Sequence, residues 1–184
     1  MASTDSMLPD TCLDTLRDMV KELGFTEVQN SSESLPTQFG TEFAKDKGDF
    51  ILFCRIMKPD YTFPYLRISP VKKYTQPLTS KQQGVIRYYR MTELFGRIVC
   101  YYMTPELSQK VFHLKDKPYE GTRSILYYHH NIDLYNYPQS LPSEAAIQTI
   151  ITCMTEQFQK VLDAIDAAGK EDEAPVRFNT SPGE

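Results

Sequence analysis

A long amphipathic pattern near the C-terminus is the feature that most limits how this chain can fold. Apolar side chains recur there at steps of three, four and one residues, the spacing that gathers them on one side of an α-helix. The pattern comprises Ile147, Ile150, Ile151, Met154, Phe158, Val161, Leu162 and Ile165. Pro142 and Glu144 suit the start of this helix, and Gly169 suits its end. At about 1.5 Å per residue such a helix is roughly 40 Å long, enough to cross a whole β-sheet.

We expect the apolar side of this helix to be the main surface packed against a sheet. Four side chains should be almost fully buried there: Ile150, Met154, Val161 and Ile165. Residues 170–184 are acidic and poor in apolar side chains, so they are expected to form a disordered tail. The 184 residues, 41% hydrophobic and 24% charged, suit one globular domain, assigned here to residues 1–169.

Shorter segments have the composition of β-strands. Residues 49–57 are apolar on both faces, which indicates a strand in the middle of a sheet. Residues 58–60 suit a turn, and residues 61–69 alternate as a returning strand. Pro64 has no N–H to donate, so we expect that strand at an edge or with a bulge. A connection over residues 69–79 should follow.

Two further helices complete the expected elements. The helix over residues 10–23 ends at Gly24, and residues 80–95 fit a helix better than a strand, although Gly84 costs up to about 1 kcal/mol there. Further strands are expected over residues 25–29, 98–103 and 123–135. This order predicts an α+β fold, in which an antiparallel β-sheet carries the N-terminal and the long C-terminal helices mainly on one face.

The cysteines and the chain ends bear on the compartment. Four cysteines are too far apart in sequence for a zinc knuckle or a CxxC redox pair: Cys12, Cys54, Cys100 and Cys153. We expect buried thiols in a reducing compartment, with no metal and no other cofactor. No apolar run approaches the ~18 residues of a membrane span, and residues 1–10 lack a secretory signal. The expected location is the cytoplasm, or the nucleus in a eukaryotic host, without membrane contact.

The catalytic motifs GxSxG, GxxxxGK[ST], GxGxxG and HExxH are absent, so an enzyme is the less favoured class. His129 and His130 are adjacent on an expected strand, so they point to opposite faces and cannot ligate one metal together. His129, Asn131 and Asp133 share a face, where they could hold a cation or act as a base with its orienting partners. The alternative is a solvated strand face without a specific role.

Charge is unevenly distributed along the chain. Between residues 67 and 97, seven basic residues stand against one acid, a net charge of +6, whereas the remainder carries −10. The basic residues are Arg67, Lys72, Lys73, Lys81, Arg87, Arg90 and Arg97. We expect them to form one contiguous binding surface with Tyr88 and Tyr89. Its partner could be nucleic acid or another polyanion, or an acidic protein. A solvated surface without a specific role is the third interpretation.

Twelve tyrosines and no tryptophan are present, several of them in adjacent pairs. Such a tyrosine-rich chain suits a protein-binding surface, and ordinary sheet propensity explains the tyrosines equally well. The element order, the small size and the acidic pI resemble the type III secretion chaperone and YbjN-like fold over residues 10–168. That resemblance implies a non-enzymatic homodimer that holds an extended segment of a client protein.

The favoured function is therefore a protein-binding module, such as an adaptor, chaperone, inhibitor or accessory factor. Its partner would be a protein, acidic or an extended peptide. A nucleic-acid, nucleotide or polyanion binder that uses residues 67–97 is the alternative.

Overall fold

The computed structural model describes residues 10–28, 40–57, 64–92, 96–102, 123–134 and 141–173. The helices are α1 (Asp10–Glu22), α2 (Ser80–Thr92) and α4 (Glu144–Glu173). The strands are β1 (Thr26–Glu27), β2 (Gly40–Asp46), β3 (Ile51–Met57), β4 (Tyr65–Tyr74), β5 (Arg97–Tyr102) and β6 (Ser124–Asp133). All neighbouring strands are antiparallel, in the order β1-β2-β3-β4-β6-β5, so β5 lies at one edge of the sheet.

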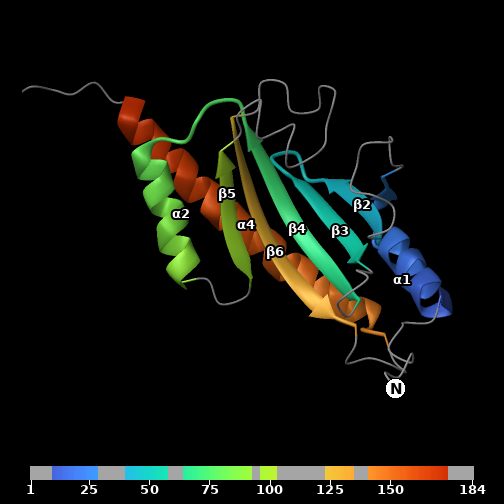
Figure 1. The fold of residues 1–184 in the computed structure, drawn as a ribbon. Coiled ribbons are helices and arrows are strands. Elements are labelled where there is room, and N and C mark those ends of the chain that lie inside the picture. The colour runs from blue at the N-terminus through green and yellow to red at the C-terminus, as the bar shows by residue number, and fades with distance from the viewer. Residues whose placement is uncertain are drawn as a thin grey trace, which may run out of the picture.

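The helices are arranged as the sequence predicts. In Figure 1, α4 crosses behind the sheet, α1 lies near the β2 end, and α2 lies beside β5. Buried side chains of α1 and α4 belong to one core cluster with the same side of the strands, so both helices cover one face. The α+β class, with the N-terminal and the long C-terminal helices on one face of an antiparallel sheet, is confirmed.

The core lies between the sheet and helices α1 and α4. Successive strand residues point to opposite faces, so every second residue of β3 enters the core. These residues, Leu52, Cys54 and Ile56, are all buried. Across from them, Phe158 of α4 packs edge-on against Phe50, with the ring centroids 5.1 Å apart. Contacts of this kind connect the long helix to the middle of the sheet.

The inward side of α4 differs from the expectation at one residue. Three of the four named side chains are fully buried: Met154, Val161 and Ile165. Ile150 is only half-buried, so the expectation for that residue is wrong. The inward stripe passes instead through Ile147 and Ile151. Each residue turns about 100° around the helix axis, which places Ile150 at the margin of the stripe.

The C-terminal end of α4 lies beyond Gly169. The helix runs to Glu173, so residues 170–173 of the expected tail are helical, and residues 174–184 lie outside the described residues. A Cβ at Gly169 would lie 2.7 Å from Nε2 of Gln82, and that nitrogen donates to the Ile165 carbonyl at 3.2 Å. Gly169 therefore permits the close approach of α2 to α4 instead of ending the helix.

Strand β4 is the clearest departure from the sequence expectation. It pairs with β3 and β6, so it lies inside the sheet, and the edge position or bulge inferred from Pro64 is wrong. Pro64 precedes the strand. Pro70 lies within it, where pairing with β6 lapses and then resumes at Val71 in the same register. The strand continues to Tyr74, through the first half of the expected connection, and the turn at 58–60 lies outside the described residues.

Strand β2 lies in a part of the sequence for which no element is expected. It pairs with β3 along its whole length and with the two residues of β1. Phe43 is its one fully buried large side chain, so the apolar alternation that marks other strands is weak here. Its pairing with β3 is therefore what shows β2 to be a strand.

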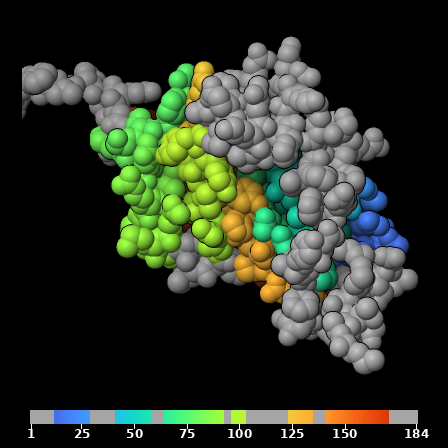
Figure 2. Space-filling model, viewed as in Figure 1, coloured from blue at the N-terminus to red at the C-terminus, as the bar shows by residue number. Residues whose placement is uncertain are grey.

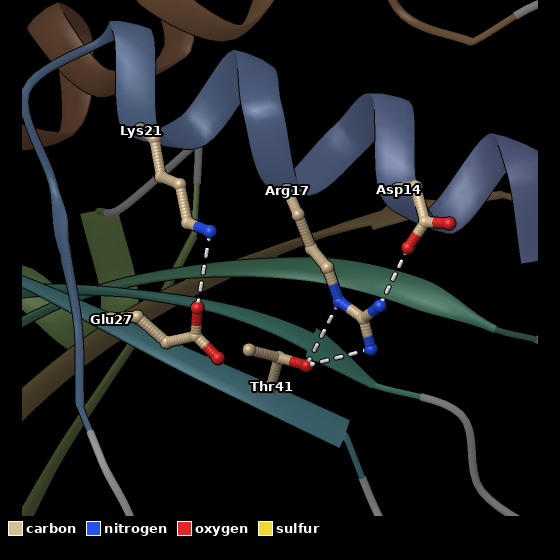
Figure 3. A network of polar contacts seen from close by, with 5 residues as sticks. All are labelled: Asp14, Arg17, Lys21, Glu27 and Thr41. Carbon is tan, nitrogen blue, oxygen red and sulfur yellow. Dashed lines mark hydrogen bonds and ion pairs between the residues drawn. The ribbon is translucent and has the colours of Figure 1, made fainter.

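Polar contacts tie α1 to these edge strands (Figure 3). The Nη1 of Arg17 donates to the Asp14 carboxylate on the same helix at 2.7 Å, and its Nε and Nη2 both donate to the Thr41 hydroxyl at 3.3 Å. Lys21 pairs with Glu27 of β1 at 3.3 Å. Exposed ion pairs contribute about 0–1 kcal/mol each, so this network orients the helix more than it stabilises it.

The predicted end of α1 is confirmed. Gly24 has φ of 81°, its N–H donates to the Lys21 carbonyl at 2.8 Å, and the Phe25 N–H donates to the Val20 carbonyl at 3.3 Å. This pair of bonds is the Schellman motif that glycine favours. The start of α2 is confirmed in the same way. Thr79 and Gln82 exchange backbone-to-side-chain bonds of 2.9 and 3.3 Å, a capping box.

Replacing Gly84 by alanine should raise the free energy of unfolding by about 0.5–1 kcal/mol. Gly84 lies inside α2, its φ is ordinary, and a Cβ there would meet nothing within 4 Å. Chemical denaturation measures the change. Gly48→Ala is the matched control. Gly48 has equally open surroundings but a φ of 83°, so this variant should be less stable than the unmodified protein. An equal response of both variants would contradict the explanation.

Candidate functional site

The face of the sheet that points away from α1 and α4 carries a mixture of polar and apolar side chains. We call it the distal face. Strips of β4, β5 and β6 are visible on it beside α2 in Figure 2. One part holds a small apolar cluster in which Val71 and Ile125 are buried and Phe53 and Tyr127 are half-buried. Polar side chains of the same strands lie next to this cluster.

The seven basic residues of 67–97 do not share one face. Alternation along β4 places Arg67 and Lys73 on the distal face and Lys72 on the side of the core. Arg97 of β5 lies on the distal face, opposite His129 of β6. The remaining three are exposed on α2: Lys81, Arg87 and Arg90. The stretch therefore divides between two surfaces, and Lys72 belongs to neither.

Two of these basic residues meet the polar triplet of β6. We name this group the arginine–histidine cluster: Arg67, Arg97, His129 and Asn131. The strand register sets Arg97 opposite His129 and Arg67 opposite Asn131. The Arg67 Nε donates to the Asn131 Oδ1 at 2.9 Å. The shared face of His129, Asn131 and Asp133 follows from their alternate positions on β6, and His130 points to the other side.

His129 lies in an unusual electrostatic setting. Its Nδ1 is buried and has no hydrogen-bond partner among the residues that the structure describes. Burial, followed by the charges of Arg67, Arg97 and His130, lowers the pKa of His129 to about 4. The ring is therefore neutral at physiological pH and is a weak base, which disfavours general-base catalysis. A cation at this place would be repelled by both guanidinium groups.

A neighbouring ion pair on the same face is not predicted by the sequence. Arg55 of β3 binds Glu42 of β2 through its Nε, and its guanidinium lies over the Phe53 ring at 5.0 Å. Its Nη1 approaches the Tyr127 hydroxyl at 3.5 Å, and Ser69 donates to that hydroxyl at 3.2 Å. The register of β2 with β3 brings the pair together, and no local pattern predicts β2.

A second surface is formed by α2 and the edge strand β5. All four exposed large apolar side chains of the described residues lie on these two elements: Tyr88, Met91, Tyr101 and Tyr102. Met91 is 88% exposed and Tyr88 is 63% exposed. Arg87 and Arg90 of α2 are also exposed. We call these six residues the α2–β5 surface. It extends around β5, because Tyr101 points to the distal face and Tyr102 to the opposite face.

The two tyrosines predicted for binding have different places. Tyr88 belongs to the α2–β5 surface, whereas Tyr89 is half-buried and packs against the core, with its ring edge-on to Tyr88 at 5.4 Å. Burial and the Cys100 thiol raise the pKa of Tyr102, while the charge of Arg87 acts in the opposite direction. Arg87 and Tyr102 are therefore close enough to interact across the boundary between α2 and β5.

Burial keeps two of the four thiols protonated. All four cysteines are free, Cys54 is buried, and the other three are half-buried. Burial raises the pKa of Cys54 to about 12 and raises that of Cys100, so both thiols stay protonated at neutral pH. Within the described residues there is no group of three or more His, Cys, Asp or Glu that could hold a metal ion. None of the described helices is long and apolar enough to cross a membrane.

Comparison with known proteins gives one informative likeness. No protein-family model matches the chain, and a search of curated proteins finds no match. The crystal structure of YbjN from E. coli, a proposed transcription regulator, superposes with a TM-score of 0.51 at 13% sequence identity. The alignment covers 90% of this chain and 96% of YbjN. The fold is YbjN-like. This finding supports that half of the sequence resemblance and not the type III chaperone half.

Proposed function

We propose that this protein is a non-enzymatic protein-binding module, and that the α2–β5 surface is where its partner binds. The observation that carries the proposal is the concentration of exposed Tyr88, Met91, Tyr101 and Tyr102 on two adjacent elements. Tyrosine, methionine and arginine are enriched in protein interfaces. Tyrosine in particular supplies a large contact area at a low cost in side-chain entropy.

The partner is an extended, acidic protein segment. Strand β5 has β6 as its one neighbour among the described strands, so its outer edge can accept another strand. Arg97 lies on β5, and Arg87 and Arg90 lie on α2 beside it (Figure 1); all three side chains are exposed. Their charges attract an acidic segment and raise its association rate. A regulatory role, as proposed for YbjN, is compatible with such binding.

Binding of a nucleic acid along the whole stretch 67–97 is less well supported. A polymer needs a continuous track of positive charge with rings for its bases. Lys72 faces the core side, Tyr89 is half-buried, and the other basic residues divide between α2 and the distal face. The protein partner therefore remains the better candidate.

Reversing two charges on α2 should weaken partner binding by at least about tenfold. A photo-reactive side chain introduced in place of Met91 first cross-links and identifies the partner in a native extract. Titration with that partner then compares the binding affinity of the unmodified protein with that of Arg87→Glu/Arg90→Glu. The loss follows because both side chains are exposed on the proposed surface. The free energy of unfolding should change by no more than about 1 kcal/mol, since Arg90 also lies in the last turn of α2.

Lys47→Glu/Lys160→Glu is the matched control, because it changes the net charge equally at two exposed sites outside the α2–β5 surface. It should bind the partner with nearly unchanged affinity. If both double variants weakened partner binding equally, the loss would come from overall net charge. The α2–β5 surface would then have no support as the binding site. Sedimentation of the same variants tests whether the protein forms a homodimer. If the cross-linked partner is a second copy of this chain, the proposal of an acidic segment as partner is wrong.

A further inference from the structure

The arginine–histidine cluster has more hydrogen-bond donors than acceptors. Arg67 uses its Nε on Asn131, and its two terminal nitrogens make no hydrogen bond with the described residues. Arg97 is exposed and makes no hydrogen bond or ion pair with them. Asn131 accepts through Oδ1, which leaves its NH2 group free to donate. These groups share one small area of the distal face.

The strand order places these donors on the distal face around His129. Arg97 on β5 and Arg67 on β4 lie on either side of β6, and adjacent strands are about 4.8 Å apart. Both arginines lie close enough to His129 for their charges to act on its ring. The Nδ1 of His129 is buried without a partner, a state that natural proteins seldom leave unexplained. His129 therefore lies on the strand between those of the two arginines, with one polar atom that has no partner among the described residues.

The acids on this face do not neutralise the two arginines. Glu42 is already paired with Arg55. Asp133 is exposed at the end of β6, and no ion pair joins it to Arg67 or Arg97 within the described residues. Like charges held together in this way are unfavourable unless an anion lies between them. Among the described residues, no acid of the distal face pairs with either of these two arginines.

We propose that the arginine–histidine cluster is an anion-binding site for a doubly charged, phosphate-type oxyanion, either inorganic phosphate or the phosphate group of a small ester. Two guanidinium groups match a double negative charge, and their planar forks suit phosphate oxygens. The Asn131 NH2 group supplies a further hydrogen bond. Tyr65 and Tyr127 flank the cluster, with the Arg67 guanidinium over the Tyr65 ring at 5.1 Å and the Tyr127 ring 5.1 Å from His129. The site lies on the distal face and shares Arg97 with the β5 edge at which we propose that the protein partner binds, but it uses neither Arg87 nor Arg90.

NMR titration of the full-length protein with inorganic phosphate at low salt tests this site. The backbone and side-chain resonances of Arg97, His129 and Asn131 should shift together and saturate, while those of Arg87 and Arg90 on α2 stay in place. Arg97→Gln should weaken binding by about tenfold, because it removes one of the two charges. Lys160→Gln, an equal charge change on α4, should leave phosphate binding unchanged. Absent or non-saturating shifts would overturn the proposal.

Sulfate provides a second readout, because it keeps its double charge in acid. Bound sulfate should raise the pKa of His129 from about 4 by offsetting the charges that lower it. The charged groups that act on the ring are Arg97 from β5 and Arg67 from β4 on the distal face, and the adjacent His130 of β6, which points to the other side of the sheet. Asp133 lies on the distal face four residues further along β6. An unchanged pKa of His129 under saturating sulfate would place the anion elsewhere.

Other anions distinguish the sources of the phosphate group. Tighter binding of a nucleoside monophosphate than of inorganic phosphate would assign the site to small esters whose base contacts Tyr65 or Tyr127. Equal binding of both would assign it to the free ion. Acetate should bind more weakly than phosphate, and equal binding would overturn the preference for a double charge. A single-stranded oligonucleotide that shifts α2 and the distal face equally would show a general polyanion surface and overturn the compact site.

Discussion

Replacing Phe158 by alanine should lower the free energy of unfolding by about 3–5 kcal/mol. Phe158 is fully buried where α4 crosses the sheet. Its ring packs edge-on against Phe50 at 5.1 Å and nearly parallel to Tyr128 at 6.5 Å. Truncation would leave a cavity among three rings that the rigid sheet cannot close. Chemical denaturation followed by circular dichroism measures the loss, which corresponds to a more than hundredfold change in the folding equilibrium at about 1.4 kcal/mol per factor of ten.

Two further variants keep this result interpretable. Glu156→Ala, two residues away on the exposed side of α4, should change stability by no more than about 0.5 kcal/mol. Phe158→Leu keeps most of the buried volume and should cost less than the alanine variant, so it reports on the site even if Phe158→Ala fails to fold. If Phe158→Ala and Glu156→Ala lost equal stability, α4 would not be the main sheet-packing helix.

Replacing Gly96 by alanine should cost about 1–3 kcal/mol or more, although the change adds one methyl group. A Cβ at Gly96 would lie 2.5 Å from Cε2 of Tyr128 and 2.7 Å from the His129 carbonyl oxygen. Tyr128 cannot move away easily, because it is fully buried, stacks on Phe158 and donates its hydroxyl to Gln157. The carbonyl belongs to the strand that β5 pairs with. Thermal unfolding measures the effect.

The direction of the stability change in Gly96→Ala shows why glycine is needed there: for close packing or for backbone freedom. Gly96 does not have a positive φ, so its need for glycine comes from close packing on β6. Gly84→Ala has open space and should move the midpoint in the opposite direction. Unaltered stability of Gly96→Ala would mean that β5 can shift away from β6 at little cost. The NMR resonances of Arg97 and His129 would then be expected to move as well.

The members of the candidate site could be named from the sequence, but their grouping could not. Arg67 and Arg97 stand out by charge, and His129 and Asn131 by strand alternation, as two separate hypotheses. They meet because β6 lies between β4 and β5, with Arg97 opposite His129 and Arg67 opposite Asn131. The same register sends Lys72 to the other side of the sheet. The pairing of strands that are distant in sequence leaves no local signal. The sequence therefore predicts one basic surface from residues 67–97, whereas the structure divides these residues between α2 and the distal face.

Local patterns were sufficient for elements whose stability depends on near neighbours. The 3.6-residue period of α4, the glycine end of α1 and the capping box of α2 all follow from residues within a few positions of one another. Long-range packing decided the rest. It placed β4 inside the sheet despite its prolines, recruited the weakly patterned β2, and left Ile150 at the margin of the helix interface. It also exposed Tyr88 while burying part of Tyr89, because only contact with β5 and α4 distinguishes the two sides of α2.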